Sequence, residues 1–186
     1  MKQHIFPAIR LTLFCAFFFM VIYPSAIWGI AQLAPDKGNG ETITLKGKTY
    51  YANIAQNFSN DKYFSSRPSA VAYNAAGAGG SNKGPSNPDY LAEVQGRIDS
   101  FLAHNPGVQK SEIPSDLVTA SGAGLDPNIS LQAANVQVKR IAAIRGIPAT
   151  SIQQIIQANT EKPLLVMLGT EKINVLKLNI SLDNLK

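Results

Sequence analysis

The chain has 186 residues, of which 45% are hydrophobic, and a formal net charge of +5. This length allows one membrane anchor followed by one domain of about 150 residues, which is enough to bury a core. The charged residues, 16% of the chain, are interspersed without runs of one sign, which excludes the basic patch typical of a nucleic-acid-binding protein.

The first predicted element is a membrane-spanning helix over residues 11–31. These twenty-one residues contain no charged side chain. At about 1.5 Å per residue they would make a helix of about 31 Å, which matches the hydrocarbon core of a bilayer. Tyr23 and Trp28 lie near its C-terminal end, where aromatic rings prefer the membrane–water interface. A cleaved signal peptide ending at Gly29-Ile30-Ala31 is the alternative, although the apolar stretch is longer than a usual signal core.

The flanks of this stretch predict its orientation. Lys2 and Arg10 precede it without any acidic residue, whereas Asp36 and Lys37 behind it cancel. Positive charge stays on the cytoplasmic side. We therefore predict that residues 1–10 are cytoplasmic, that residues 11–31 span the membrane, and that residues 32–186 form one extracytoplasmic domain.

The connector after the anchor contains one alternating stretch, residues 42–45, which predicts a short strand. Ile54 and Phe58 have helical spacing and favour a short helix within residues 50–58. Residues 63–88 are too rich in Gly, Asn, Ser and Pro for a core element and predict a long loop. Loops of this length inside a compact domain are usually functional or disordered. Its aromatic residues Tyr63, Phe64 and Tyr73 favour an ordered loop that faces a partner.

Three helices are predicted next. Asn87 followed by Pro88 marks the start of the first, and residues 105–107 end it. Ser130 caps the second, which runs to about Arg145 with Gly146 behind it. Thr150, with Gln153 three residues later, resembles a capping box that opens the third helix.

The C-terminal segment predicts two strands, residues 164–168 and 173–180, joined by residues 169–172. The second alternates polar and apolar side chains from Val175 onward. The chain is therefore predicted to be an α+β protein, with one membrane helix followed by a single domain of mixed helices and strands.

No motif predicts an active site. Lys83 lies between Asn82 and Gly84, which does not fit the Gly-Lys-Ser/Thr ending of a phosphate-binding loop. Ser121 lacks the Gly-x-Ser-x-Gly turn of a hydrolase nucleophile. Asp116 and Asp126 fit a general acid and base, but turn capping is the simpler role for each.

Metal and disulfide chemistry are not indicated either. The two histidines, His4 and His104, do not suffice for a metal site. The one cysteine, Cys15, lies in the apolar stretch and has no second cysteine to pair with.

The residues favour a binding role instead. An anchor holds the following domain at the membrane surface, where it meets a membrane partner at high effective concentration. The long loop and the turn over residues 121–126 offer aromatic, Arg and backbone groups for that contact. The candidate contact residues are Tyr63, Phe64, Arg67, Pro68, Ser81, Asn82, Ser121 and Asp126.

Several blocks, in order along nearly the whole chain, resemble one family. They are Tyr23-Pro24, YFSSRPSA at 63–70, GGSN at 79–82, SNP at 86–88, DLVTAS at 116–121, GLDPNIS at 124–130, AA at 133–134 and NVLKLN at 174–179. With these blocks the sequence resembles the C subunit of the Kdp-type potassium-transporting ATPase.

The resemblance implies a single-pass accessory subunit in the inner membrane of a bacterial cell, within a complex that couples ATP hydrolysis to potassium uptake. Its implied partners are a channel-like potassium-translocating subunit and a P-type ATPase subunit. The C subunit is implied to carry out neither step and to act as a catalytic chaperone that raises the ATP affinity of the ATPase subunit.

ATP is therefore expected to be reached through the ATPase subunit. The nucleotide element proposed for the family, Leu-Ser-x-x-Gln, is replaced here by IPATS at residues 147–151. This departure, and the predicted location outside the cytoplasm, count against direct contact with ATP. An exported enzyme and an exported binding domain unrelated to potassium transport are the alternatives.

Overall fold

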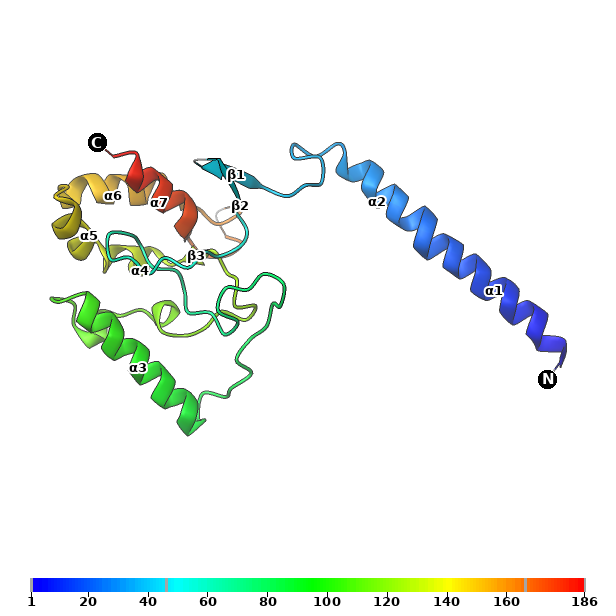
Figure 1. Cartoon of the computed structure of the whole chain (residues 1–186), viewed down its shortest axis with the longest axis horizontal. Helices are drawn as coiled ribbons and strands as arrows, with labels where there is room; N and C mark the ends of the chain where they lie inside the picture. The colour runs from blue at the N-terminus through cyan, green and yellow to red at the C-terminus, as the bar shows by residue number, and fades with distance from the viewer. Residues whose placement is uncertain (1, 46, 166, 186) are drawn as a thin grey trace. The chain divides into compact units, whose positions relative to one another are not determined.

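The structure is a computed structural model that describes residues 2–45, 47–165 and 167–185. It divides into two compact units, Met1–Tyr51 and Ala52–Lys186. The second unit contains α-helices together with a small antiparallel sheet, so the predicted α+β class is confirmed (Figure 1).

The first unit consists mainly of one long helical run. After the turn η1 (Lys2–His4), the elements α1 (Ile5–Phe17), η2 (Phe18–Ile22) and α2 (Tyr23–Ala31) follow without interruption. The η2 segment is π-helical and comes just before Pro24, which has no amide hydrogen and whose ring would clash with a carbonyl one turn earlier in a regular α-helix.

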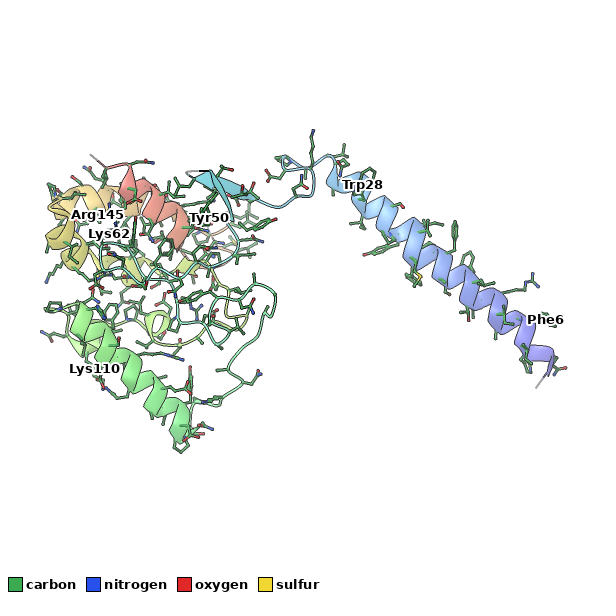
Figure 2. All side chains as sticks on the ribbon, viewed as in Figure 1. Phe6, Trp28, Tyr50, Lys62, Lys110 and Arg145 are labelled. Carbon is green, nitrogen blue, oxygen red and sulfur yellow. The ribbon has the colours of Figure 1, made fainter. Side chains whose placement is uncertain are left out.

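This run contains the predicted membrane helix and begins six residues earlier. Among the described residues, Ile5–Ala31 is the helix long and apolar enough to cross a bilayer, judged by its length and composition. None of its described side chains is buried, as the projecting rings of Phe6 and Trp28 illustrate (Figure 2). Such a surface is typical of a helix whose surroundings are lipid or other helices.

A β-hairpin completes the first unit. Strand β1 (Thr42–Leu45) pairs antiparallel with β2 (Lys48–Tyr51). The predicted strand over residues 42–45 is therefore confirmed. The short helix predicted within residues 50–58 is wrong, because Tyr50 and Tyr51 belong to β2 and the Ala55 amide donates instead to the carbonyl oxygen of Leu125 at 2.9 Å.

The second unit contains five α-helices among its described residues. They are α3 (Pro88–His104), α4 (Leu131–Asn135), α5 (Val138–Arg145), α6 (Ala149–Ala158) and α7 (Val175–Asp183), with the 3₁₀ turns η3 (Lys110–Glu112) and η4 (Ser115–Leu117). Helix α3 begins as predicted, since the Asn87 side chain accepts from the Tyr90 amide at 3.1 Å. Gly146 ends α5 with φ +66°, also as predicted.

The sheet of this unit has three short antiparallel strands. They are β3 (Asn128–Ile129), β4 (Thr160–Glu161) and β5 (Lys172–Asn174), with β5 in the centre. The core lies between this sheet and helices α4 to α7, and α3 runs along the other side of the unit (Figure 1). Its large fully buried side chains include Phe64, Ile129, Ile141, Ile152, Ile156, Ile173, Leu178 and Leu182.

The helix predicted from Ser130 to Arg145 is interrupted. Ser130 caps its first part, because its Oγ accepts from the Ala133 amide at 3.0 Å. The chain then turns at Val136 and Gln137 before α5 begins. The Gln137 side chain is fully buried and bonds the Ser65 amide, so a tertiary contact determines the geometry of this turn.

The predicted opening of the third helix at Thr150 is also wrong. Helix α6 starts at Ala149, with Pro148 as its cap residue and no side-chain cap hydrogen bond. Proline fixes φ near −65° and therefore starts a helix without a capping box.

Neither predicted C-terminal strand is correct over its whole length. Residues 164 and 168 form only a bridge with one another, and Val166 lies outside the described residues. Strand β5 ends at Asn174, whose side chain accepts from the Lys177 amide at 3.1 Å and so begins helix α7. The buried side chains of α7 follow helical spacing: Val175, Leu176, Leu178, Asn179 and Leu182.

Candidate functional site: a docking surface formed by two loops

The start of the long loop is fixed to the core by buried amide side chains. The Asn179 side chain bonds both backbone groups of Phe64, accepting from its amide at 2.9 Å and donating to its carbonyl at 3.0 Å. The Gln137 side chain accepts from the Ser65 amide at 2.9 Å. An amide that bonds backbone in this way replaces a strand partner. Phe64 is fully buried as a result, so its side chain belongs to the core and not to the surface.

Tyr63 lies at the edge of this anchored segment. Its hydroxyl donates to Asp183 Oδ2 at 2.9 Å, and the Arg145 guanidinium lies 4.9 Å from its ring centre. Burial and the neighbouring Asp183 raise the pKa of the Tyr63 hydroxyl. Tyr63 therefore joins α5 to α7 and keeps only part of its surface exposed.

Two loops pack against one another beyond this point. The first comprises residues 65–82 and the second residues 119–128; together they are called the loop pair. Their hydrogen bonds run from Ser69 Oγ to Gly124 O (2.6 Å), from Gly79 N to Ala123 O (3.0 Å) and from Ser121 N to Pro68 O (3.4 Å). Because the bonds involve both arms of the first loop, the loop pair is one structural unit.

Two glycines allow this close approach. A Cβ atom on Gly80 would lie 2.8 Å from the carbonyl oxygen of Gly122. Gly124 has φ +69°, and a Cβ there would lie 2.7 Å from Val71 Cγ2. Both distances are shorter than any ordinary carbon contact, so a side chain at either position would separate the loops.

An ion pair closes the base of the loop pair. Arg67 Nη1 donates to Asp126 Oδ2 at 2.9 Å, and the other oxygen of Asp126 accepts from the Asn128 amide at 3.0 Å. The Tyr73 hydroxyl donates to the carbonyl oxygen of Arg67 at 2.8 Å, and burial raises the pKa of that hydroxyl. The Arg67 Nε atom is enclosed and has no hydrogen-bond partner among the described residues. The ion pair between Arg67 and Asp126 thus links the first loop to the second.

The outer surface of the loop pair is neutral and small. No residue between Arg67 and Lys83 is charged, and none from 119 to 125. Its exposed residues are Ala70, Ala72, 74–78, Asn82, Gly122 and Ala123. Ser81 is half-buried beside Asn82, whose φ is +54°. Small side chains on an ordered loop let another protein approach the backbone closely.

The eight predicted contact residues therefore fall into two groups. Arg67, Pro68, Ser121 and Asp126 are brought together inside the loop pair, and Ser81 and Asn82 follow at its edge. Ser121 is buried, so it supports the surface without forming it. The remaining two, Tyr63 and Phe64, fix the loop to the core.

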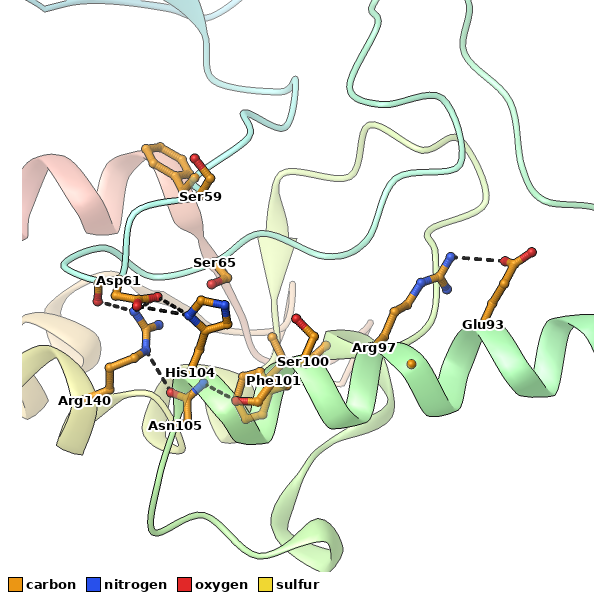
Figure 3. A pocket seen from close by; sticks show the side chains of 13 residues that line it. Ser59, Asp61, Ser65, Glu93, Arg97, Ser100, Phe101, His104, Asn105 and Arg140 are labelled. Carbon is orange, nitrogen blue, oxygen red and sulfur yellow. Dashed lines mark hydrogen bonds and ion pairs between the residues drawn. The ribbon is translucent and has the colours of Figure 1, made fainter.

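Elsewhere in the second unit a hollow of about 500 Å³ lies between α3 and residues 58–65 (Figure 3). Its polar side chains are bonded mainly to one another. His104 Nδ1 lies 3.0 Å from an Asp61 oxygen, and Arg97 lies 3.5 Å from Glu93 (Figure 3). In the described part of the chain the His104 ring contacts Asp61, and no serine is hydrogen-bonded to it.

Arg140 forms the floor of this hollow and has a structural role. It is 8% exposed, and burial lowers its pKa, which Asp61 partly offsets. Its guanidinium donates to Asn105 Oδ1 at 2.8 Å and to Gln137 Oε1 at 2.8 Å, and it also bonds the backbone carbonyl of Asp61. The guanidinium therefore joins the segment at Asp61, the end of α3 and α5.

The described residues contain no group of three or more His, Cys, Asp or Glu side chains that could hold a metal ion. Asp116 and Asp126, the two carboxylates that fit a general acid and base, have other partners: Asp116 accepts from the Ser130 amide at 2.7 Å, and Asp126 pairs with Arg67.

The comparisons with known proteins agree with the sequence blocks. Residues 5–184 match the family described as KdpC, the c chain of the K⁺-transporting ATPase. The chain belongs to the KdpC family. A potassium-transporting ATPase KdpC subunit of Flavobacterium psychrophilum is 53% identical, over 99% of this chain and 100% of the relative.

Two further relatives have the same description. The protein of Flavobacterium johnsoniae is 52% identical over 99% of this chain and 100% of its own length. That of Bacteroides thetaiotaomicron is 50% identical over 98% of each chain. The family resemblance inferred from the sequence blocks is thereby confirmed.

Sequence reasoning missed the amides that hold the loop in place. Gln137 lies in the turn before α5, and Asn179 lies on the apolar face of α7; both side chains are buried. A polar side chain among apolar neighbours must find a partner when it is buried. That signal was available, but the identity of the partner, the backbone of residues 64–65, required the structure.

Proposed function

We propose that the chain is a non-catalytic accessory subunit of a bacterial potassium-transporting ATPase complex. Residues 11–31 of the helix Ile5–Ala31 anchor it in the inner membrane, with residues 1–10 in the cytoplasm and the second unit outside. Membership of the KdpC family supports the assignment to the complex, and the uncharged 11–31 stretch with Lys2 and Arg10 before it supports the orientation.

The loop pair is the surface through which this subunit contacts its neighbours. Its partner in the proposal is the channel-like subunit that carries potassium, and docking there stabilises the assembled complex. The observation that carries the proposal is the joining of residues 65–82 to residues 119–128 by hydrogen bonds and an ion pair, beneath a neutral surface of small residues. A rigid surface loses little conformational entropy on binding, which favours affinity.

Any influence on ATP passes through the P-type ATPase subunit. Residues 147–151 read IPATS, and Pro148 occupies the cap position of α6, where the family's nucleotide element would begin. Proline has no amide hydrogen to offer a phosphate. ATP is also a cytoplasmic metabolite, on the other side of the membrane from the proposed location of this domain.

Charge reversal at the base of the loop pair tests the docking proposal. Arg67→Glu places two carboxylates at the 2.9 Å contact, which separates the loops, whereas the double variant Arg67→Glu with Asp126→Arg restores an ion pair. The single variant is expected to co-purify poorly with the partner subunits and the double variant to recover. Deletion of residues 77–84 removes part of the outer surface together with the Gly79–Ala123 hydrogen bond, and it is expected to abolish co-purification.

Controls make the result specific. Gln157→Glu changes the charge of an exposed residue on α6, away from the loop pair, and should leave co-purification unchanged. Far-ultraviolet circular dichroism of each variant establishes that the chain is folded. Full co-purification of both Arg67→Glu and the deletion variant would contradict the docking proposal.

A further inference from the structure

One segment of the second unit presents aliphatic side chains to solvent. Leu164, Leu165, Met167 and Leu168, called the apolar tip, are 70%, 73%, 80% and 57% exposed. Among the described residues of this unit, only Leu91 and Ile144 are other large hydrophobic side chains classed as exposed. An aliphatic cluster as exposed as this marks a contact with another apolar phase or protein.

The backbone of the tip is closed on itself. The Leu164 amide donates to the carbonyl of Leu168 at 3.2 Å, and the Leu168 amide donates back at 2.9 Å. Leu165 has φ +53° and Gly169 has φ +108°. A leucine rarely adopts such a conformation, and glycine at position 165 would satisfy the turn without strain. Position 165 thus carries a bulky apolar side chain although its backbone conformation favours glycine.

We propose that the apolar tip inserts into the surface of the lipid bilayer in which the chain is anchored. Its chemistry fits hydrocarbon: no residue from 163 to 170 is charged, and the tip has no aromatic side chain. Protein hot spots favour Trp, Tyr and Arg over Leu. The backbone groups of Leu164 and Leu168 are paired with each other, which lowers the cost of bringing these two residues into lipid.

The length of the tether brings the bilayer within reach. About twenty residues separate Ala31, the last residue of α2, from Ala52, the first of the second unit, so their extended length is at most about 70 Å. The β1–β2 hairpin folds back on itself and shortens this span. A unit of this size has a radius of gyration of about 14 Å. A lipid surface is therefore always accessible to it. The inference depends on the anchor and not on docking by the loop pair.

Site-directed spin labelling of the full chain tests the proposal. In a Cys15→Ser background, a nitroxide is attached at Met167→Cys, with Leu91→Cys on α3 as the matched exposed control. The protein is reconstituted in vesicles of phosphatidylcholine and phosphatidylglycerol. Collisions with oxygen, which enters hydrocarbon, are compared with collisions with a water-soluble nickel chelate. We expect the nickel collision rate at 167 to be roughly tenfold below that at 91, because polar reagents are excluded from hydrocarbon.

A charged variant provides the internal test. Leu165→Asp tolerates the positive φ and places a carboxylate in the tip, so the label at 167 should return to water. The variant Leu91→Asp should leave the label at 167 in lipid. Equal nickel access at 167 and 91 in vesicles would overturn the proposal. So would shielding of 167 that requires the other subunits of the complex, since the tip would then contact protein.

Discussion

Replacing Gly124 by alanine is the sharpest test of how the loop pair is built. The new Cβ would lie 2.7 Å from Val71 Cγ2 and 3.0 Å from the carbonyl oxygen of Gly79, at φ +69°. The left-handed backbone costs an L-residue about 1–2 kcal/mol, and overpacking adds about 1–3 kcal/mol. We expect Gly124→Ala to lower the free energy of unfolding by about 2–5 kcal/mol and to separate the two loops.

The same turn provides a matched control. A Cβ on Gly122 meets no atom within 4 Å, and its φ lies outside the left-handed range. Gly122→Ala should therefore be neutral or stabilise the fold by up to about 1 kcal/mol. The assay is urea unfolding of the full chain in detergent, with hydrogen exchange of residues 66–82 as the local readout. Equal stability and equal exchange in the two variants would refute the close approach of the loops.

Three further substitutions test hydrogen bonds that hold the second unit together. Asn179→Leu leaves the amide and carbonyl of Phe64 buried without partners and should destabilise the fold by about 2–4 kcal/mol, measured by urea midpoint. Arg140→Met removes a buried donor of several hydrogen bonds and should cost about 3 kcal/mol in the same assay. Burial raises the pKa of Tyr73, so the folded state holds that proton more tightly than the unfolded state. Its contribution is complete below about pH 10 and is lost as the pH rises through the folded pKa. Tyr73→Phe should lose about 1 kcal/mol at neutral pH and make the alkaline fall shallower in a pH series of unfolding curves. An unchanged alkaline limb would show that the Tyr73 proton is not linked to folding.

Local signals in the sequence predicted the elements that local chemistry determines. The Asn87 cap before Pro88, the Ser130 cap and Gly146 at the end of α5 each fix a backbone conformation within a few residues. The long uncharged stretch, residues 11–31, also predicted its helix from local signals alone. A segment that crosses lipid forms a helix because the helix pairs its backbone groups within itself.

The C-terminal segment shows where local patterns fail. Alternation from Val175 onward predicted a strand, but Asn174 caps a helix and Asn179 is buried on its apolar face. Reading Asn179 as an exposed polar residue produced the period of a strand. Its actual partner is the backbone of Phe64, 115 residues away along the chain, and no local pattern contains that pairing.

For the candidate site, the sequence singled out residues but did not show which contacts join them. The loop residues Arg67 and Pro68 and the turn residues Ser121 and Asp126 were singled out separately, and the structure places them in one unit. Which loop pairs with which depends on contacts across more than fifty residues, such as the ion pair of Arg67. Phe64, a candidate contact residue from the sequence, is fully buried and fills the core instead.

Cysteine accessibility in intact cells tests the central claim most directly. In a Cys15→Ser background, single cysteines replace Gln3, Ala75 in the first loop and Gln157 on α6, all of them exposed. With the chain expressed alone, an impermeant reagent should label positions 75 and 157 but not position 3. With the other subunits present, position 75 should become protected while position 157 stays labelled. Labelling of position 3 alone would invert the orientation, and equal labelling of position 75 in both cases would contradict docking through the loop pair.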